Sequence, residues 1–200
     1  MAMPGFNKKF EILLVLQAAV FAAMLTQAED PPRVARPTVV KINLSEMIQP
    51  VSAKYVLRGI RHANEINAAA ILIELSTPGG LEKSLREMVQ GMIKSKVPVI
   101  VHVSPSGSRA ASAGFFLLLA ADVAVMAPGT NSGAAHPVLL GGKKISDVME
   151  GKILNDSAAY IRSIASRRGR NVELAEKGVR ESRSYTEKEA LEGNLIDAIA

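Results

Sequence analysis

From residue 38 onward, hydrophobic positions follow two different periods in turn. Short, nearly continuous apolar runs are typical of strands buried on both faces, and we find them at 38–46, 68–75, 97–105 and 122–128. Between these runs the apolar residues take a helical spacing, as in the stripe of Leu81, Leu85, Met88, Val89, Met92 and Ile93. This exchange of strand and helix predicts an α/β fold with a mainly parallel sheet.

Further helices are expected on either side of these runs. The segment 52–66 has helical spacing, and a helix-rich stretch is expected from about 145 to 182. Near the end of the chain, Thr186 and Glu189 form a capping box for a last short helix, which Gly193 can end.

The first 37 residues have a different pattern. Lys8 and Lys9 precede an apolar run, and Ala28 offers a small residue at a cleavage site just before Glu29, as in a secretory signal peptide. We therefore expect residues 1–28 to be a signal peptide or a membrane anchor, 29–37 a linker, and 38–200 the mature domain. Such a protein is exported, to the periplasm or the extracytoplasmic face of the membrane.

Composition narrows the possible chemistry. Aromatic residues make up only 4% of the chain, so the core must be built from aliphatic residues and Met. The chain has no Cys, which excludes a disulfide, a thiolate nucleophile and a thiolate metal site. The cluster Arg167, Arg168 and Arg170 could contact acidic lipid headgroups, or it could be a solvated helix end. Without interleaved aromatic residues or a recognition module, we expect no nucleic-acid binding.

Three loops should meet at the carboxyl edge of the sheet, where parallel α/β folds bind their ligands: 76–80, 104–112 and 128–136. In the first, "STPGG", Gly79 and Gly80 can present backbone N–H groups at the start of a helix, as an oxyanion hole requires. A simple strand-to-helix turn would also use these glycines. The phosphate-loop pattern of Gly and Lys is not found.

Ser112 is the candidate nucleophile, in the small-residue stretch "AASAG" that precedes an apolar helix. Its alternative role is tight packing. A serine nucleophile needs a base. We expect His62 to be a solvated surface residue and His102 to be a structural residue, so neither is the favoured base. This leaves His136, on the third loop, and Lys152. A lysine becomes a base only where burial lowers its pKa.

Three stretches carry a family resemblance: "IELSTPGG", "GSRAASAGFFLLLAADVAVMAPGTNSGAAHPV" and "AYIRSIASRRGRN". Together they resemble the N-terminal protease domain of the NfeD family, membrane-bound serine proteases of the ClpP class. The resemblance implies a ClpP/crotonase-like fold of repeated β-β-α units and peptide hydrolysis by a Ser–Lys dyad of Ser112 and Lys152. It places the oxyanion hole at Gly79, Gly80 and Ala113, and it implies no metal or cofactor.

The resemblance also suggests partners and leaves rivals open. Family members cleave hydrophobic segments, often of stomatin-like membrane proteins, and assemble as dimers or larger rings. His136 keeps a ClpP-like Ser–His triad as an alternative, although no aspartate is evident to orient it. Two rival functions are a crotonase-type acyl-CoA enzyme and a non-catalytic scaffold for a membrane partner.

Overall fold

The structure is a computed structural model that describes residue 17 and residues 37–138 and 146–200. The predicted signal or anchor segment, 1–28, and the linker, 29–37, lie outside the described residues apart from positions 17 and 37. In the part of the chain described, no helix has the length and apolar character that crossing a bilayer requires. Residues 37–200 form a compact unit with its own hydrophobic core.

The main sheet has five strands, all parallel, in the order β1-β2-β3-β5-β8. They are β1 (Val39–Leu44), β2 (Ala70–Leu75), β3 (Val99–Val103), β5 (Val123–Met126) and β8 (Ala198–Ile199). The four apolar runs seen in the sequence are the first four of these strands, slightly shortened at their ends. The predicted α/β class with a mainly parallel sheet is therefore confirmed.

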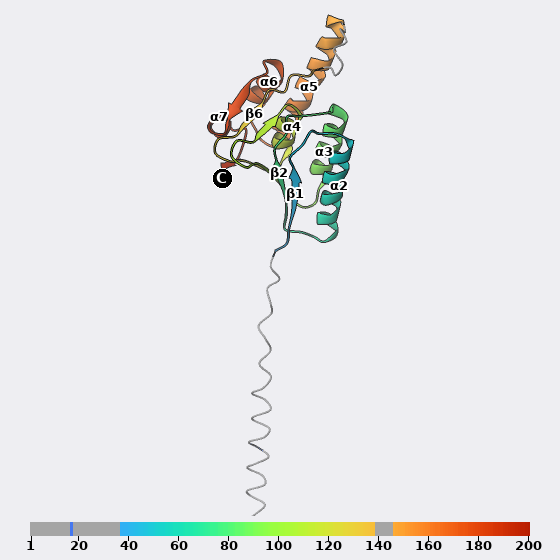
Figure 1. The fold of residues 1–200 in the computed structure, drawn as a ribbon, viewed down its shortest axis with the longest axis vertical. Coiled ribbons are helices and arrows are strands. Elements are labelled where there is room, and N and C mark those ends of the chain that lie inside the picture. The colour runs from blue at the N-terminus through green and yellow to red at the C-terminus, as the bar shows by residue number, and fades with distance from the viewer. Residues whose placement is uncertain (1–16, 18–36, 139–145) are drawn as a thin grey trace, which may run out of the picture. The chain divides into compact units, whose positions relative to one another are not determined.

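Residues 37–138 and 146–200 contain six helices, which pack against the sheets and against one another (Figure 1). They are α2 (Pro50–Glu65), α3 (Glu82–Lys94), α4 (Ala113–Ala120), α5 (Asp147–Arg167), α6 (Val172–Arg180) and α7 (Glu187–Glu192). The predicted stripe of α3 is buried except at its two ends, where Leu81 is exposed and Ile93 half-buried. The capping box of Thr186 and Glu189 is confirmed at the start of α7, which ends at Gly193 as expected.

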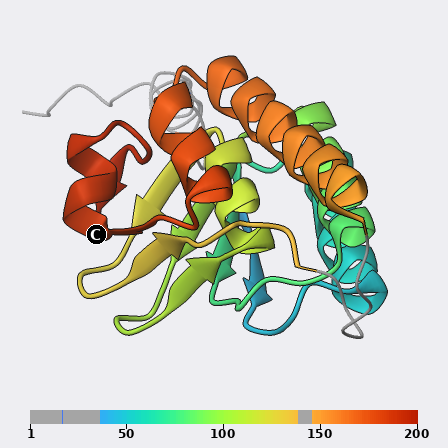
Figure 2. The same ribbon diagram turned by 90° about the horizontal axis from the view of Figure 1, so that it is seen from above.

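Helix α4 forms the centre of the core, with α5 packed alongside it (Figure 2). All eight residues of α4 are buried, which explains why the sequence is apolar all around this helix. Phe116 of α4 stacks on Tyr160 of α5 with ring centroids 5.8 Å apart, and Phe115 stacks on Tyr185 at 6.1 Å. Aliphatic residues and Met make up most of the remaining core, as the composition predicts.

A second, smaller sheet was not predicted. It contains β4 (Arg109–Ala111), β6 (Asn131–Gly133) and β7 (Ser184–Thr186), with β4 parallel to β6 and β6 antiparallel to β7. Strands of three residues are too short to show an alternating pattern. This sheet matters for function because it holds together two of the three loops expected at the ligand-binding edge.

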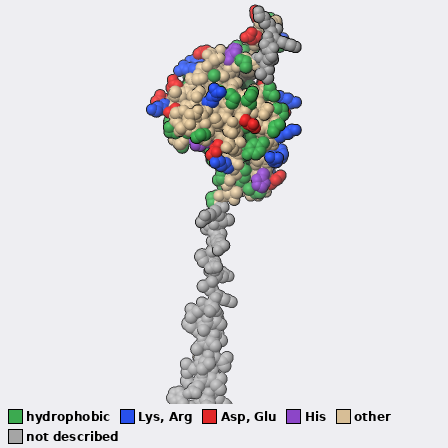
Figure 3. All heavy atoms as spheres, viewed as in Figure 1, with side chains coloured by type: hydrophobic (Ala, Val, Ile, Leu, Met, Phe, Trp, Pro, Cys, Tyr) green, Lys and Arg blue, Asp and Glu red, His purple; other side chains and the backbone are tan. Residues whose placement is uncertain are grey.

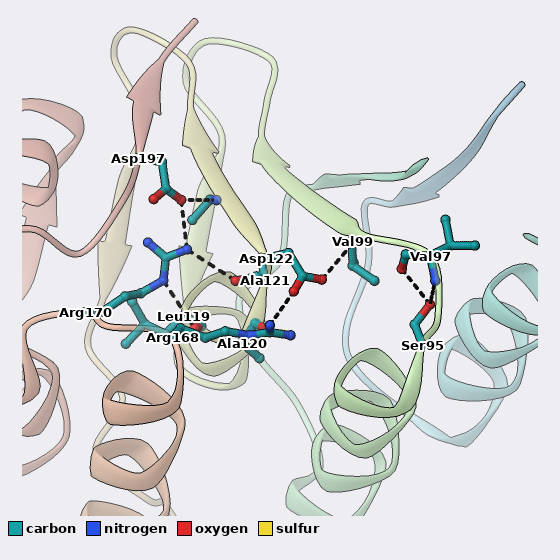
Figure 4. A network of polar contacts seen from close by, with 11 residues as sticks. Ser95, Val97, Val99, Leu119, Ala120, Ala121, Asp122, Arg168, Arg170 and Asp197 are labelled. Carbon is teal, nitrogen blue, oxygen red and sulfur yellow. Dashed lines mark hydrogen bonds and ion pairs between the residues drawn. The ribbon is translucent and has the colours of Figure 1, made fainter. Parts of the chain in front are cut away.

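The arginine cluster does not form one surface (Figure 4). Arg168 pairs with Asp122 and donates to the Ala120 carbonyl at 2.7 Å. Arg170 is buried, with only 5% of its surface exposed. It donates to the carbonyl oxygens of Leu119, Ala121 and Leu195 at 3.1–3.3 Å and pairs with Asp197 at 2.8 Å. Of these three arginines, Arg167 alone is exposed and has no ion-pair partner among the described residues.

Arg170→Met is expected to lower the free energy of unfolding by about 3 kcal/mol, because it leaves several buried carbonyl groups without a donor. The matched change of its exposed neighbour, Arg167→Met, should lie within about 0.5 kcal/mol of the parent. Urea unfolding followed by circular dichroism measures both variants. Equal stability of the two would contradict the structural role of Arg170.

Candidate active site

The three predicted loops do meet at the carboxyl edge of the sheet. Thr77, in the first loop, accepts a hydrogen bond at its carbonyl from the Ala111 N–H at 3.1 Å, and its own N–H donates to the Arg109 carbonyl at 2.8 Å. The Ser112 N–H donates to the carbonyl of Gly133, in the third loop, at 2.8 Å. Ser112 therefore lies at the junction of all three segments.

Ser112 has a conformation that is unusual for a residue with a side chain. It caps the amino end of α4 with φ 52° and ψ −117°. Such a backbone costs on the order of 1–3 kcal/mol and persists only where the surrounding structure imposes it. Ser112 is half-buried, and its hydroxyl makes no hydrogen bond to another described residue. This geometry presents one hydroxyl at the start of a buried helix.

Gly79 provides the space for that hydroxyl. A Cβ on Gly79 would lie 2.6 Å from the Ser112 Cβ and 3.0 Å from its Oγ. The Gly79 N–H, which was expected to bind an oxyanion, instead donates to Thr77 Oγ1 at 3.1 Å. The Thr77 hydroxyl in turn donates to the Glu46 carbonyl at 2.7 Å. In this structure Gly79 thus gives access to Ser112, while its amide is already occupied.

Gly79→Ala is therefore expected to reduce turnover at Ser112 strongly. The new methyl group would collide with Ser112, and the backbone φ of 115° at position 79 strains any residue with a side chain. We expect at least about a hundredfold loss of kcat/KM, since even small misplacement of reacting groups is costly. Peptidase kinetics measure it. Gly107→Ala is a matched control, because Gly107 also has positive φ but a Cβ added there would meet no atom within 4 Å.

Two other amides stay available for an oxyanion among the described residues. The Ala113 N–H is the first of α4, where a helix has no internal acceptor for its N–H groups and where the dipole favours negative charge. The Gly80 N–H has no hydrogen bond in the described structure. A side chain at Gly80 cannot fit, because a Cβ would lie 2.0 Å from the Ile48 carbonyl oxygen.

Lys152 lies on the first turns of α5 and is exposed. Its ammonium makes no hydrogen bond or ion pair within residues 37–138 and 146–200, so the described structure does not bring Lys152 to Ser112. The first buried residue of α5 is Ser157. Figure 1 shows the start of this helix extending past the body of the domain.

The packing of α5 nevertheless places Lys152 at the same end of the domain as Ser112. Tyr160 stacks on Phe116. Lys152 lies eight residues, about 12 Å of helix, before Tyr160, and Ser112 lies four residues, about 6 Å, before Phe116. Lys152 and Ser112 therefore both lie on the amino-terminal side of this contact.

Contacts with α3 fix α5 just below Lys152. Arg86 of α3 pairs with Asp156 and lies over the Tyr160 ring, with 4.2 Å from the guanidinium carbon to the ring centroid. Burial raises the pKa of the Tyr160 hydroxyl, although the charge of Arg86 opposes this shift. The phenol is therefore neutral at pH 7. Before Asp156, α5 is held by Asn155, whose Oδ1 accepts a hydrogen bond from Arg180 at 3.1 Å, and by Leu154, which is partly buried against the core.

The three histidines occupy different environments. His62 is exposed on α2, as expected, and His102 is half-buried with Nε2 3.1 Å from the Ala200 carbonyl oxygen. His136 is half-buried with Nδ1 3.2 Å from the Val179 carbonyl oxygen. The group that orients His136 is therefore a backbone carbonyl, whereas a Ser–His–Asp triad uses a carboxylate.

Sequence reasoning missed two residues that build the site. Thr77 is buried and orients Gly79, and Ile48 forms a parallel bridge with Gly80. Neither residue shows a periodic signal, because both lie in short loop segments. No group of three His, Asp or Glu side chains that could hold a metal ion occurs in the described ranges.

Comparison with known sequences finds one protein family and two curated relatives. The family model of the NfeD1b N-terminal domain matches residues 38–199. Over 145 residues, 72% of this chain, the chain is 42% identical to the membrane-bound protease PH1510 of Pyrococcus horikoshii. Over 116 residues, 58% of this chain, it is 32% identical to the membrane protein NfeD1b of Bacillus subtilis. These matches span only 33% and 26% of the two relatives.

Two solved structures are similar over most of the domain. One is a serine-to-alanine mutant of the 1510-N membrane-bound stomatin-specific protease, with a TM-score of 0.78, 37% identity, and coverage of 84% of this chain and 81% of that one. The other is a lysine-to-alanine mutant in complex with a substrate peptide, with a TM-score of 0.77, 36% identity, and coverage of 84% and 77%. The fold predicted from the sequence agrees with this protease domain.

Proposed function

Because the chain belongs to the NfeD1b N-terminal domain family, we propose that it is a serine peptidase that uses a Ser–Lys dyad of Ser112 and Lys152. The observation that carries this proposal is the strained Ser112 at the amino end of α4, with Gly79 leaving its hydroxyl accessible. The similarity to a protease whose serine and lysine mutants were studied, one with a substrate peptide, supports it.

The proposed reaction is acyl transfer. Ser112 Oγ attacks the scissile carbonyl carbon while neutral Lys152 takes the hydroxyl proton, and the N–H groups of Gly80 and Ala113 bind the resulting oxyanion. The C–N bond then breaks as Lys152 gives its proton to the leaving amine. Water then attacks the acyl carbon and loses a proton to Lys152. The C–O bond to Ser112 Oγ breaks as Lys152 returns this proton to Oγ, which releases the acid and restores Ser112 and neutral Lys152.

This mechanism requires α5 to change its position or its surroundings. Lys152 is exposed in the present structure, and a lysine accepts a proton only in its neutral form, which burial favours. The first turn of α5, which precedes the core contact of Leu154, also carries exposed Val148 and Met149. We propose that these apolar side chains pack against the bound substrate or a second subunit, bringing Lys152 over Ser112.

Hydrophobic peptides fit the surface beside Gly80. Met47, which precedes the bridging residue Ile48, is 54% exposed, and Leu81, directly after Gly80, is 39% exposed. Apolar substrate side chains could bury both. The related 1510-N protease is described as stomatin-specific, and we propose a stomatin-like membrane protein as the substrate class here. We further propose export of the domain and its assembly into dimers or larger oligomers.

Hydrolysis of a panel of substrates tests the proposed function. The protein should cleave a fluorogenic peptide with apolar residues flanking the scissile bond. It should cleave an acidic peptide of equal length more slowly, and it should leave acyl-CoA thioesters unchanged. Thioester turnover without peptide cleavage would identify a crotonase-type enzyme. Failure to turn over any substrate, by oligomeric protein in the presence of lipid, would favour a non-catalytic scaffold.

A further inference from the structure

One end of the domain collects the beginnings of the parallel strands and the ends of the helices that connect them. Backbone and side-chain contacts join these segments. The Ala69 N–H donates to the Thr38 carbonyl at 2.8 Å, and the Lys96 N–H donates to Asn64 Oδ1 at 2.9 Å. The Val99 N–H donates to Asp122 Oδ2 at 2.9 Å, in the network of Figure 4. We name this surface, which is formed by the starts of the parallel strands and the ends of helices α2, α3 and α5, the base. Ser112 lies at the opposite end of the domain.

The base is rich in unpaired cations. Four exposed side chains on it have no ion-pair partner among the described residues: Arg61, Lys94, Lys96 and Arg167. In contrast, Asp122 and Asp197 are each neutralised by an arginine of the domain itself. Two exposed carboxylates at this end, Glu65 and Glu192, lack such a partner in the same residues. Unpaired cations therefore outnumber unpaired acids.

These charges alone do not identify a partner, because a cation at the carboxyl end of a helix also interacts well with the helix dipole. Exposed apolar side chains give the second observation. Val39 is 50% exposed, Ile66 44% and Val123 39%, and each begins a strand or ends a helix at the base. Figure 3 shows hydrophobic, Lys or Arg, and His side chains at the end of the domain where β1 begins, together with Asp or Glu side chains.

Cations interspersed with exposed apolar side chains suit the surface of an anionic membrane, where the cations meet headgroup phosphates and the apolar tips reach the acyl boundary. A shallow groove of about 380 Å³ between β1 and α2 adjoins this surface. Arg58, Arg61 and Glu65 are among its lining residues, and Lys41, which also lines it, pairs with Glu74. A phosphate headgroup is small enough to occupy it.

The covalent path of the chain points to the same surface. β1 begins at Val39, so everything before residue 37 joins the domain at the base. If residues 1–28 form the predicted anchor, the nine residues of the linker reach at most about 30 Å. A tether of that length holds the domain within about 30 Å of the lipid, and its attachment point is at the base.

We infer that the base docks on a membrane surface that carries anionic lipid headgroups, with Ser112 on the side of the domain that faces away from the bilayer. The strands of six residues separate the two ends by about 20 Å. Substrates must then be segments that extend out of the membrane. This inference goes beyond the proposed function and stands whether or not Ser112 is the nucleophile.

Two cysteine reporters test the orientation, because the chain has no cysteine of its own. Ser166, on the last turn of α5, is exposed at the base, and Ser45, just after β1, is exposed at the opposite end. Ser166→Cys and Ser45→Cys are labelled with the same fluorophore in the full chain. Each is mixed with phosphatidylcholine vesicles, with or without phosphatidylglycerol, that carry a headgroup-bound nitroxide quencher.

We expect the label at position 166 to be quenched only with phosphatidylglycerol and released at high salt, and the label at position 45 to be unaffected. Changing Arg61, Lys94, Lys96 and Arg167 together to Gln should weaken this docking at least about tenfold, since each cation near an anionic surface contributes about fivefold. Circular dichroism checks that the variant is folded. Flotation of the full chain with neutral phosphatidylcholine vesicles measures separately any membrane binding through the predicted anchor, residues 1–28.

Three results would overturn the inference. One is quenching at position 166 that does not depend on lipid charge. Another is unchanged docking of the folded four-residue variant. The third is quenching at position 45 in place of 166, which would show that the Ser112 end faces the lipid.

Discussion

Ser112→Ala is expected to lower kcat/KM for a hydrophobic peptide by at least about a thousandfold, because it removes the atom that forms the acyl-enzyme. The melting temperature should change little. The Ser112 hydroxyl has no hydrogen bond to lose among the described residues, and alanine meets much the same backbone strain at φ 52° as serine does. Steady-state hydrolysis and thermal unfolding of the same preparation measure both effects.

Ser106→Ala is the matched control for that loss. Ser106 is exposed in the loop that leads to Ser112, and its replacement removes an equivalent hydroxyl nearby. This variant should retain the activity of the parent to within about twofold. Undiminished turnover by folded Ser112→Ala would contradict the proposed nucleophile.

Lys152→Ala is expected to lower kcat by about 10²–10⁴-fold, the range that general acid–base groups contribute. Its stability should match that of the parent, because Lys152 is exposed and forms no ion pair within the described residues. Peptide binding should also persist, so the loss falls on kcat more than on KM. Peptidase kinetics over a range of substrate concentrations separate the two parameters.

Two controls accompany the Lys152 variant. Lys83→Ala removes another exposed lysine, from the first turn of α3, and should retain activity. His136→Ala should also retain activity, because the Nδ1 of His136 faces the Val179 carbonyl and no carboxylate among the described residues orients the ring. Loss of activity in His136→Ala alone would establish the Ser–His alternative in place of the dyad.

The main sheet could be predicted from the sequence because its strands leave long apolar runs. The expectation of burial on both faces was met only in part: β2 and β3 are buried on one face and half-buried on the other. The stripe of α3 was equally clear, and its two exceptions have a physical reason: Leu81 and Ile93 lie at the ends of the helix, where burial by the core stops. The small sheet left no such trace. Its strands β4, β6 and β7 have three residues each and depend on contacts between distant segments.

The candidate site was predicted in part, because small residues before an apolar helix identify Ser112. The sequence could not show that Thr77 would engage the Gly79 amide, since that contact depends on the exact turn of one loop. The arginines near 170 illustrate the same limit. Gly169, with φ 66°, turns the chain at the end of α5, so Arg167 points to solvent while Arg170 enters the core.

The position of Lys152 also lay beyond the sequence pattern. Helical spacing indicates that α5 exists, but it does not say how far the helix extends past its packing partners. In the structure, Leu154 is partly buried against the core, Asp156 pairs with Arg86 of α3, and full burial begins at Ser157. The turn that carries Lys152 therefore depends on whatever packs against it during the reaction.

Mapping of the covalent adduct formed with a fluorophosphonate is the most direct test of the account. We expect a single adduct, on the peptide that contains Ser112. The adduct should be absent in Ser112→Ala, should form at least about a hundredfold more slowly in Lys152→Ala, and should form at the parent rate in His136→Ala. An adduct on another serine, or labelling of Ser112 at the parent rate without Lys152, would contradict it.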